Sequence, residues 1–366
     1  MKKAWIIVVA ASQLILSGCW DQRILKESRL VFGTGMDLIE DDRLLVTSVI
    51  RDYSNNVPIN AIVTGEGRTF RETRMDMDRK IAGRFDPSKN RVFLFGEKLV
   101  QKDLYSFLDV VYRDPDASVS SKLAVVKGNA GDVLNAGRVQ NVLIAEYLIK
   151  LIESEEKETT IPEQSLQTIC SVLFDDGKDF GLPAIKREGD EIILDGMAMF
   201  NRHTLAGYLS PDETVLLQML LNKKAKIARY VSKINENQEP ANKNYISYTF
   251  LKSKAKMKIL SAQPGRMRAE ITMKAEINVA EYPQDTLTKE KTKKQLNRKI
   301  SKELTEDAER VISKIQEANS DLFGIARELM AYYPDRWDKV EWKKEYPSME
   351  IVPKVEVEIT EYGVIN

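Results

Sequence analysis

The chain has 366 residues, of which 43% are apolar, and its 55 lysines and arginines balance 55 aspartates and glutamates. This length predicts two or three domains with packed cores, and the balanced charge argues against a nucleic-acid-binding protein, which typically has a basic excess. One histidine and two cysteines exclude a histidine-rich metal centre and a cysteine zinc finger. We therefore expect neither a metal ion nor a cofactor.

The first nineteen residues predict a lipoprotein signal. Lys2 and Lys3 precede a largely apolar stretch, residues 4–16, which is too short to cross a bilayer but suits the hydrophobic region of a secretory signal. Residues 16–19 have the lipobox sequence LSGC. We predict that Cys19 receives a diacylglyceryl group and that residues 1–18 are then removed. The alternatives are an ordinary secretory signal with an incidental cysteine, or a short buried helix.

Lipidation of Cys19 would leave Cys170 without a partner for an intramolecular disulfide. The stability of the mature chain must then come from packed cores, and we interpret Cys170 as a small core residue. A nucleophilic pair of Cys170 and His203 is a formal alternative. The sequence around the two residues resembles no protease signature, and His203 is expected in a surface loop, so we predict no catalytic residue.

Strands and helices alternate in the N-terminal half, from about residue 28 to residue 174. In chain order, we expect strands at residues 30–38, 43–51, 91–95 and 123–126, and helices at residues 69–81, 99–112 and 139–152. The first two strands should form a hairpin around the acidic residues 40–42, and the charged residues 153–158 should be a solvated helix end. This order is typical of an α/β or α+β fold.

The middle of the chain contains a candidate domain junction near residues 175–183. Residues 175–179 (DDGKD) are acidic, but they lack the ligand spacing of a calcium-binding EF-hand, so a surface turn is expected. A strand is expected at residues 192–200. Ser210, Pro211 and Glu213 then predict the start of a helix, with serine as the N-cap, proline at the first helical position and glutamate completing a capping box.

Apolar and polar residues alternate strictly in the C-terminal third, at residues 251–259, 269–279 and 351–359. This period of two predicts strands with one buried face. Between the last two strands lies a predicted long helix with one apolar stripe, formed by Leu296, Ile300, Leu304, Ala308, Val311, Ile315 and Ala318. A second helix is expected at residues 320–331. We expect an antiparallel sheet that packs on this stripe; a coiled-coil seam is the alternative.

Two features of this third, a row of lysines and a pair of tryptophans, can each be interpreted as structural or as functional. Lys252, Lys254, Lys256 and Lys258 form a row that could contact a membrane or an anionic ligand. We favour a solvated sheet face on which these lysines pair across strands with acidic residues, namely Glu270, Glu276 or Glu356.

The aromatic feature is the pair Trp337 and Trp342. We expect the two rings to clamp the return of the chain from the helix to the last strand. A partner-binding aromatic patch is the alternative.

The predicted fold class is therefore α/β to α+β with several domains. The signal peptide covers residues 1–18, an N-terminal mixed strand and helix domain residues 19–180, and a middle segment or small domain residues 181–240. A C-terminal domain, an antiparallel sheet packed on a long amphipathic helix, covers residues 241–366.

Several segments carry a family resemblance. Residues 19–23 (CWDQR), directly after the lipobox, resemble the start of the C-subunit lipoproteins of spore germination receptors, the Ger(x)C family. Further similar segments follow in the expected order: residues 181–183 (GLP), 205–214 (LAGYLSPDET), 319–324 (NSDLFG), 334–337 (PDRW) and 361–363 (EYG). One departure is at Ile325 and Ala326, where the family is expected to have a second glycine.

The resemblance implies a non-enzymatic subunit of a nutrient germinant receptor, with a multi-domain α/β fold. In that family the lipoprotein is anchored on the outer face of the inner spore membrane, beside two integral membrane subunits of the A and B types. We hypothesise that it assembles and stabilises the receptor in nutrient-triggered germination. The resemblance does not say which nutrient is sensed or whether this subunit contacts it.

Two other classes of protein remain as alternatives. A free-standing solute-binding lipoprotein would need two similar lobes around a cleft, whereas the two halves of this sequence have different patterns of elements. A spore cell-wall hydrolase can work with two carboxylates and no histidine. The sequence offers 55 acidic residues and no spacing that selects a pair.

Overall fold

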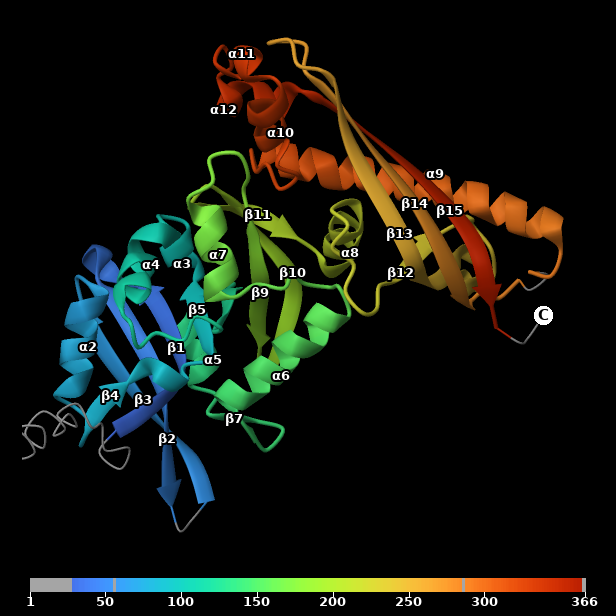
Figure 1. The fold of residues 1–366 in the computed structure, drawn as a ribbon. Coiled ribbons are helices and arrows are strands. Elements are labelled where there is room, and N and C mark those ends of the chain that lie inside the picture. Colours follow the sequence, from blue (N-terminus) through green and yellow to red (C-terminus); the bar gives the residue numbers. More distant parts are fainter. Residues whose placement is uncertain (1–27, 55–56, 285–286, 364–366) are drawn as a thin grey trace, which may run out of the picture.

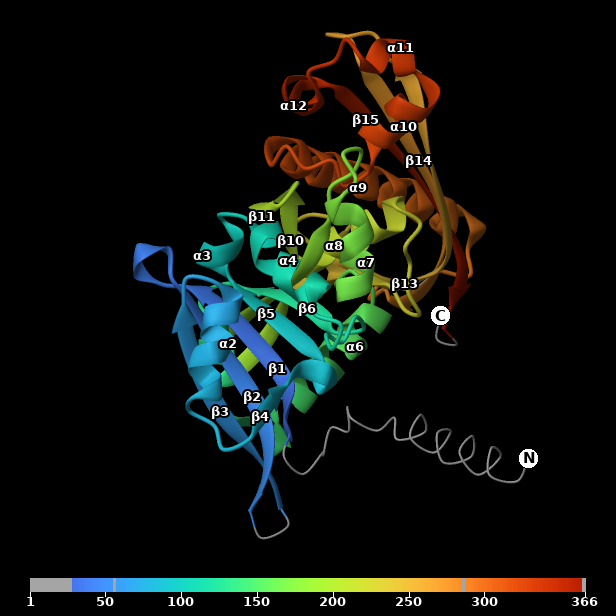
Figure 2. The same ribbon diagram turned by 60° about the vertical axis from the view of Figure 1, so that its left-hand side comes forward.

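The chain folds into two lobes. The computed structural model describes residues 28–54, 57–284 and 287–363. Figure 1 shows a larger N-terminal lobe, built around one sheet, and a C-terminal lobe in which a second sheet lies across a long helix. Helix α8 (Pro211–Leu220) lies between the two lobes, as Figures 1 and 2 both show. The predicted fold class, a multi-domain mixture of α/β and α+β architecture, is confirmed.

The N-terminal lobe contains a nine-stranded mixed sheet with the order β11-β10-β9-β6-β5-β1-β2-β3, and β4 pairs with β1. Its strands are β1 (Ser28–Leu38), β2 (Leu44–Ser54), β3 (Val57–Gly67), β4 (Arg84–Asp86), β5 (Val92–Gly96), β6 (Lys122–Val126), β9 (Gly181–Glu188), β10 (Glu191–Asn201) and β11 (Thr204–Leu209). The central pairs β1–β5, β5–β6 and β6–β9 are parallel, and the outer pairs are antiparallel. The predicted hairpin of β1 and β2, joined by a 3-10 turn at Glu40–Asp42, is confirmed.

Helices cover both faces of this sheet, so its central strands are buried on both sides. Along β5, Phe93 and Phe95 pack with the helices on one face, while Val92 and Leu94 pack with those on the other. The first face carries α2 (Phe70–Asp78), α3 (Glu97–Val100), α4 (Leu104–Arg113) and α7 (Leu166–Leu173). The second carries α5 (Ala130–Leu134) and α6 (Ile144–Lys157), and a small hairpin of β7 (Arg138–Val139) and β8 (Val142–Leu143) precedes α6.

Two predictions for this lobe were wrong in detail. The single helix expected at residues 99–112 is two helices, since α3 ends at Val100 and α4 begins after Asp103, whose side chain accepts from the N–H of Tyr105 as the N-cap. The expected solvated end of α6 is partly buried. Glu156 is 8% exposed and accepts two hydrogen bonds, 2.8 and 2.7 Å long, from the Lys122 ammonium on β6.

The C-terminal lobe contains a four-stranded sheet in the order β12-β13-β14-β15, packed on helix α9 (Glu290–Glu317). Its strands are β12 (Arg229–Lys233), β13 (Tyr245–Ser261), β14 (Arg268–Glu281) and β15 (Glu350–Tyr362). The predicted apolar stripe of α9 is confirmed from Leu296 to Ile315, whose members are buried, whereas Ala318 is the half-buried C-cap residue. Three short helices follow: α10 (Ile325–Tyr332), α11 (Pro334–Trp337) and α12 (Trp342–Glu345).

The sheet differs from the expected antiparallel arrangement in its last strand. Strands β12, β13 and β14 are antiparallel, but β15 pairs with β14 in parallel. A parallel pair needs a long crossover, and α9 with the three short helices provides it. The alternating sequence of β15 determines which of its faces is buried. The same alternation occurs in parallel and antiparallel strands, so it could not predict the direction of β15.

The segment expected to be a middle domain, residues 181–240, is divided between the two cores. Strands β9, β10 and β11 belong to the large N-terminal sheet, whereas α8 and β12 contribute to the core of the C-terminal lobe. The predicted capping box is confirmed, because the Ser210 side chain accepts from the Glu213 N–H and the Glu213 side chain accepts from the Ser210 N–H. The proposed domain boundaries themselves stay predictions.

The outer edge of β15 is occupied by polar side chains of α9. The backbone N–H groups of Val355, Val357 and Ile359 donate to Thr305 Oγ1 at 3.2 Å, Ser301 Oγ at 2.9 Å and Asn297 Oδ1 at 3.0 Å, respectively. These three acceptors are four residues apart, so they lie on one side of the helix. Edge strands with free N–H groups invite pairing with other chains, and this ladder blocks that edge.

We expect Ser301→Ala to lower the free energy of unfolding by about 1–2 kcal/mol, because it leaves the Val357 N–H without its acceptor. The matched control is Ser313→Ala on the same helix, since Ser313 is exposed and bonds only Glu317 four residues on. Urea unfolding of both variants measures the difference. Equal midpoints would show that the ladder does not stabilise the edge.

Candidate functional site

The predicted lipidation residue, Cys19, lies outside the described residues. Within the described ranges, no helix has both the length and the apolar character required to cross a membrane. Cys170, on α7, is half-buried and its thiol is free. The proposed modification of Cys19 therefore rests on the sequence alone.

The formal pair of Cys170 and His203 is not formed. His203 Nε2 lies 3.0 Å from the Leu173 carbonyl oxygen, and His203 Nδ1 lies 3.8 Å from Asp103 Oδ1. The imidazole also stacks on the Tyr105 ring with the centroids 5.1 Å apart. Both ring nitrogens are thus directed to groups other than the thiol, and His203 links the β10–β11 turn to α4 and α7.

The acidic segment at residues 175–179, expected from the sequence to be a surface turn near a domain junction, contacts the C-terminal lobe through its side chains. In the part of the chain that the structure describes, no group of acidic, histidine or cysteine side chains is arranged to hold a metal ion. Instead, Asp175 forms an ion pair with Arg327 on α10. Asp179 Oδ1 accepts from the Arg202 N–H at 2.6 Å, and Asp179 Oδ2 accepts from the Asp321 N–H at 2.7 Å.

Asp321 is the central residue of this junction. It is 2% exposed, and its carboxylate accepts from the N–H groups of Gly324, Ile325 and Ala326 at 2.8, 3.0 and 2.8 Å, so it caps α10. The Asp179 N–H donates to the Asp321 carbonyl oxygen at 3.0 Å. Burial outweighs these hydrogen bonds and raises the pKa of Asp321 to about 6, and burial likewise raises the pKa of Asp179.

Neighbouring residues extend the same contact. Ser320 Oγ donates to the Phe200 carbonyl oxygen at 2.5 Å, and the buried Tyr346 hydroxyl donates to the Ser320 carbonyl oxygen at 3.0 Å. The two tryptophans expected to form an aromatic clamp lie together, with the Trp337 and Trp342 rings 5.7 Å apart, and their role as a clamp stays a prediction. Trp342 also lies 5.2 Å from the Tyr346 ring. The sequence singled out residues 319–324 and the tryptophans, but not the partner role of Asp179.

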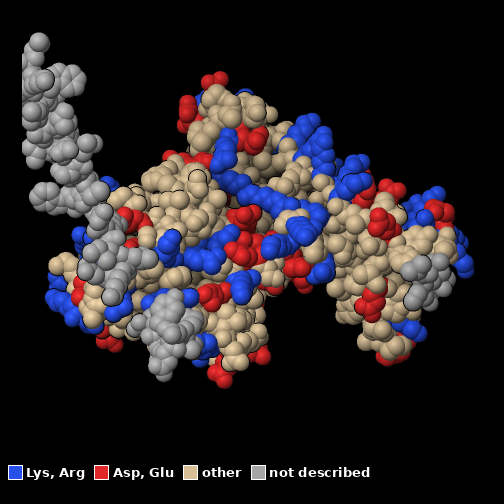
Figure 3. Space-filling view, turned by 60° about the horizontal axis from the view of Figure 1, so that its bottom comes forward, with Lys and Arg blue, Asp and Glu red and all other residues tan. Residues whose placement is uncertain are grey.

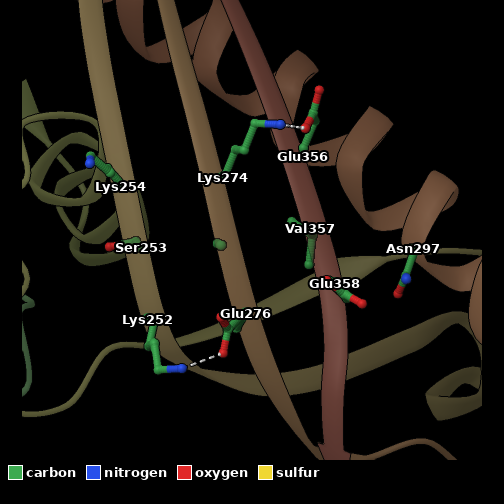
Figure 4. Close-up of a pocket in the computed structure, with 10 residues that line it drawn as sticks. Lys252, Ser253, Lys254, Lys274, Glu276, Asn297, Glu356, Val357 and Glu358 are labelled. Atoms are coloured by element: carbon green, nitrogen blue, oxygen red, sulfur yellow. Dashed lines mark hydrogen bonds and ion pairs between the residues drawn. The ribbon is translucent and has the colours of Figure 1, made fainter.

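On the charged face of the C-terminal sheet, lysines form ion pairs with glutamates of neighbouring strands. A hollow of about 670 Å³ lies on this face, with Lys252 and Glu276 3.0 Å apart and Lys274 and Glu356 2.6 Å apart. Figure 4 shows these two ion pairs across neighbouring strands. Glu270 pairs with Lys354 at 2.5 Å. The prediction of cross-strand pairing is thus confirmed for Lys252, while Glu270 and Glu356 have other lysines as partners. This face has no excess of unpaired charge at the hollow.

Basic side chains are concentrated elsewhere, as Figure 3 shows between the two lobes on the face that it draws. Three cations from different parts of the chain line one cavity of the structure: Lys178 before β9, Lys223 after α8 and Arg327 on α10. Sequence analysis missed this group, because the three residues are far apart in the chain and none has a distinctive local pattern.

Comparisons with known proteins match nearly the whole chain. The family described as "Spore germination protein N-terminal domain" matches residues 21–187, and the family described as "Spore germination B3/ GerAC like, C-terminal" matches residues 195–363. The chain is 26% identical over 365 residues to spore germination protein GerQC of Bacillus cereus, covering 99% of each chain. It is 22% identical to spore germination protein KC of Bacillus subtilis (strain 168), covering 98% of this chain and 96% of that protein.

The fold also matches a solved structure. The crystal structure of the GerBC protein aligns with a TM-score of 0.56 and 20% identity, over 90% of this chain and 97% of that one. This similarity concerns the fold alone. Both halves match family descriptions in the order in which they occur along the chain, as the segments of the sequence resemblance do. The chain belongs to the Ger(x)C family of spore germination proteins.

Proposed function

We propose that this chain is the lipid-anchored, extracytoplasmic C subunit of a nutrient germinant receptor, and that it assembles and stabilises that receptor rather than catalysing a reaction. The observation that carries this proposal is the match of both halves to spore germination families. The relatives GerQC and KC, which align over almost their full lengths, are named as spore germination proteins. The sequence of the lipobox supports the anchor.

The proposed anchor limits where the protein can lie. Cys19 would carry two acyl chains, which together hold a protein durably at a bilayer, whereas one chain binds only marginally. Nine residue steps separate Cys19 from Ser28, where β1 begins. A fully extended chain spans at most ~3.5 Å per residue, so the start of β1 would lie within roughly 30 Å of the membrane surface. The N-terminal lobe would therefore be within reach of integral membrane subunits.

The proposed role in assembly is supported by the way in which the two lobes are joined. Asp179, Asp321 and Ser320 connect them through hydrogen bonds that involve backbone groups. Two lobes that are joined by such hydrogen bonds offer separate surfaces on one body, which suits a subunit that holds two membrane proteins together. We propose that the A-type and B-type integral membrane subunits are these partners, on the outer face of the inner spore membrane.

Affinity purification from detergent-solubilised spore membranes tests the proposal. A tagged form of this chain is expected to be recovered together with two polytopic membrane proteins, identified by mass spectrometry. A tagged spore lipoprotein from another family, carrying the same kind of anchor, is the control for co-purification through shared micelles. Recovery of the tagged chain alone, in mild detergent and with the anchor intact, would instead favour a free-standing solute-binding lipoprotein.

A further inference from the structure

A cavity of about 580 Å³ lies where the two lobes meet. Its wall is formed by the segment before β9, the end of α8 and the first turn of α10. Three cationic side chains line it, namely Lys178, Lys223 and Arg327, together with two carboxylates, Asp175 and Asp179. An apolar wall completes it, which includes Phe180, Met197, Leu217, Leu221 and Leu322.

Two of these three cations lack a counterion. Arg327 pairs with Asp175, but within the described ranges the ammonium groups of Lys178 and Lys223 form neither an ion pair nor a hydrogen bond. Elsewhere in the protein, lysines near carboxylates form ion pairs, as Lys122 does with Glu156. Asp175 pairs with Arg327, and Asp179 accepts from two backbone N–H groups, so neither carboxylate pairs with the two lysines. The lining therefore has one more cation than carboxylates, and its two unpaired ammonium groups lie beside apolar surface.

Close packing fixes the backbone positions of two of these cations. A Cβ atom on Gly177 would lie 2.9 Å from Arg327 Cα, so α10 approaches the backbone of the segment before β9 directly. The Arg327 N–H donates to the Gly177 carbonyl oxygen at 3.0 Å. Gly324 similarly leaves room for the aliphatic part of Lys178, whose Cδ would lie 3.2 Å from a Cβ atom there. These contacts hold Lys178 and Arg327 next to each other.

The arrangement is electrostatically costly without an anion. Burial and the neighbouring Lys223 and Arg327 lower the pKa of Lys178 to about 8, against the opposing effect of Asp321 and Asp175. Burial and Arg327 also lower the pKa of Lys223. A bound anion would relieve this repulsion, because an opposite charge favours the protonated form of each lysine.

A polar side chain of α8 also lines the cavity. Gln218 is 5% exposed, and its side-chain amide carries both a hydrogen-bond donor and an acceptor. Its N–H groups could donate to the oxygen atoms of a bound anion.

We propose that this cavity binds a small organic anion. The carboxylate or phosphate oxygens of the ligand would contact Lys178, Lys223 and Arg327, and its apolar part would lie against Phe180 and Leu322. The volume is within the range of ~300–1,000 Å³ that is usual for small-molecule sites. This inference goes beyond the proposed receptor role and does not depend on the lipid anchor. Since the wall comes from both lobes, the bound anion would also stabilise their mutual arrangement.

Titration calorimetry of the detergent-solubilised full-length protein tests the site with two probes. Hexanoate provides an oxyanion with an apolar tail, and inorganic phosphate provides an oxyanion alone. We expect saturable hexanoate binding and weaker phosphate binding. Lys178→Gln and Lys223→Gln should each weaken hexanoate binding about ten-fold or more, because each removes one charge-assisted contact. Lys178→Arg should retain most of the affinity for hexanoate, because it keeps the positive charge.

Lys226→Gln is the matched control, because Lys226 is exposed in the same loop as Lys223 and does not line the cavity. It should bind hexanoate as the wild type does. Circular dichroism checks that each variant is folded. Absence of saturable binding of hexanoate would overturn the proposal, as would equal affinities for the Lys178→Gln and Lys226→Gln variants. Phosphate binding as tight as hexanoate binding would overturn the assignment to an organic anion.

Discussion

A Cys19→Ala variant is expected to leave the membrane fraction of disrupted spores and to appear in the soluble fraction, and its spores should respond poorly to nutrients. The physical reason is that the substitution removes the only proposed acylation site of the chain. Each buried CH₂ group of a lipid chain contributes about 0.8 kcal/mol to membrane binding, so the loss of two chains should release the protein almost completely. Immunoblotting of the two fractions measures the release, and the fall in optical density of spore suspensions measures germination.

The matched control for this experiment is Cys170→Ala. It removes the other cysteine of the chain, which lies half-buried on α7 with a free thiol, and should leave both membrane attachment and germination unchanged. If the Cys19→Ala protein stays with the membrane, another part of the chain or a partner holds it there. If it is released but the spores germinate normally, anchoring is not needed for the function of the receptor.

Local sequence patterns predicted those parts of the fold that depend on neighbouring residues. The apolar spacing of α9 identified its buried stripe, and the serine, proline and glutamate at the start of α8 identified a capping box. These features depend on contacts within about four residues, which a periodic sequence displays directly. The resemblance to the Ger(x)C family, confirmed by both family matches, added the assignment that periodicity could not supply.

Contacts between distant residues were not predictable in the same way. The parallel pairing of β15 depends on the path of the crossover, and the burial of Glu156 depends on Lys122, which is 34 residues away. Asp179 and Asp321 meet across 142 residues. The cavity cations come from three elements that only the folded chain brings together. Glu156, Lys122, the two aspartates and the cavity cations all have charged side chains, which a sequence pattern alone assigns to the surface.

Asp321 is expected to make the stability of the protein depend on pH. Its pKa in the folded state is about 6, above its ordinary value of 3.8, so the folded chain binds a proton more readily than the unfolded chain between these two values. The stabilisation from this proton is fully present below the ordinary pKa and is lost as the pH rises through about 6. A shift of this size corresponds to about 3 kcal/mol.

Asp321→Asn isolates this effect, since asparagine has nearly the same shape and does not titrate. The wild type should lose about 3 kcal/mol of unfolding free energy relative to this variant between about pH 4 and about pH 7. The wild type must be compared with the variant because other groups with shifted pKa values, including Asp179 and Asp37, titrate in both proteins. Guanidinium unfolding at several pH values measures it, and Asp338→Asn, which removes the same charge from an exposed position, gives the baseline.

The unfolding free energy of the wild type minus that of Asp321→Asn, plotted against pH, distinguishes two roles for the Asp321 carboxylate by the sign of its slope. If the three N–H groups that cap α10 dominated, the charged form would be favoured, and the wild type would gain stability over the variant as the pH rises. Burial at 2% exposure and the nearby Asp179 carboxylate argue for the opposite slope. A flat or rising curve would therefore contradict the assigned protonation. A falling curve would mean that the two lobes are joined more tightly in mildly acidic than in neutral solution.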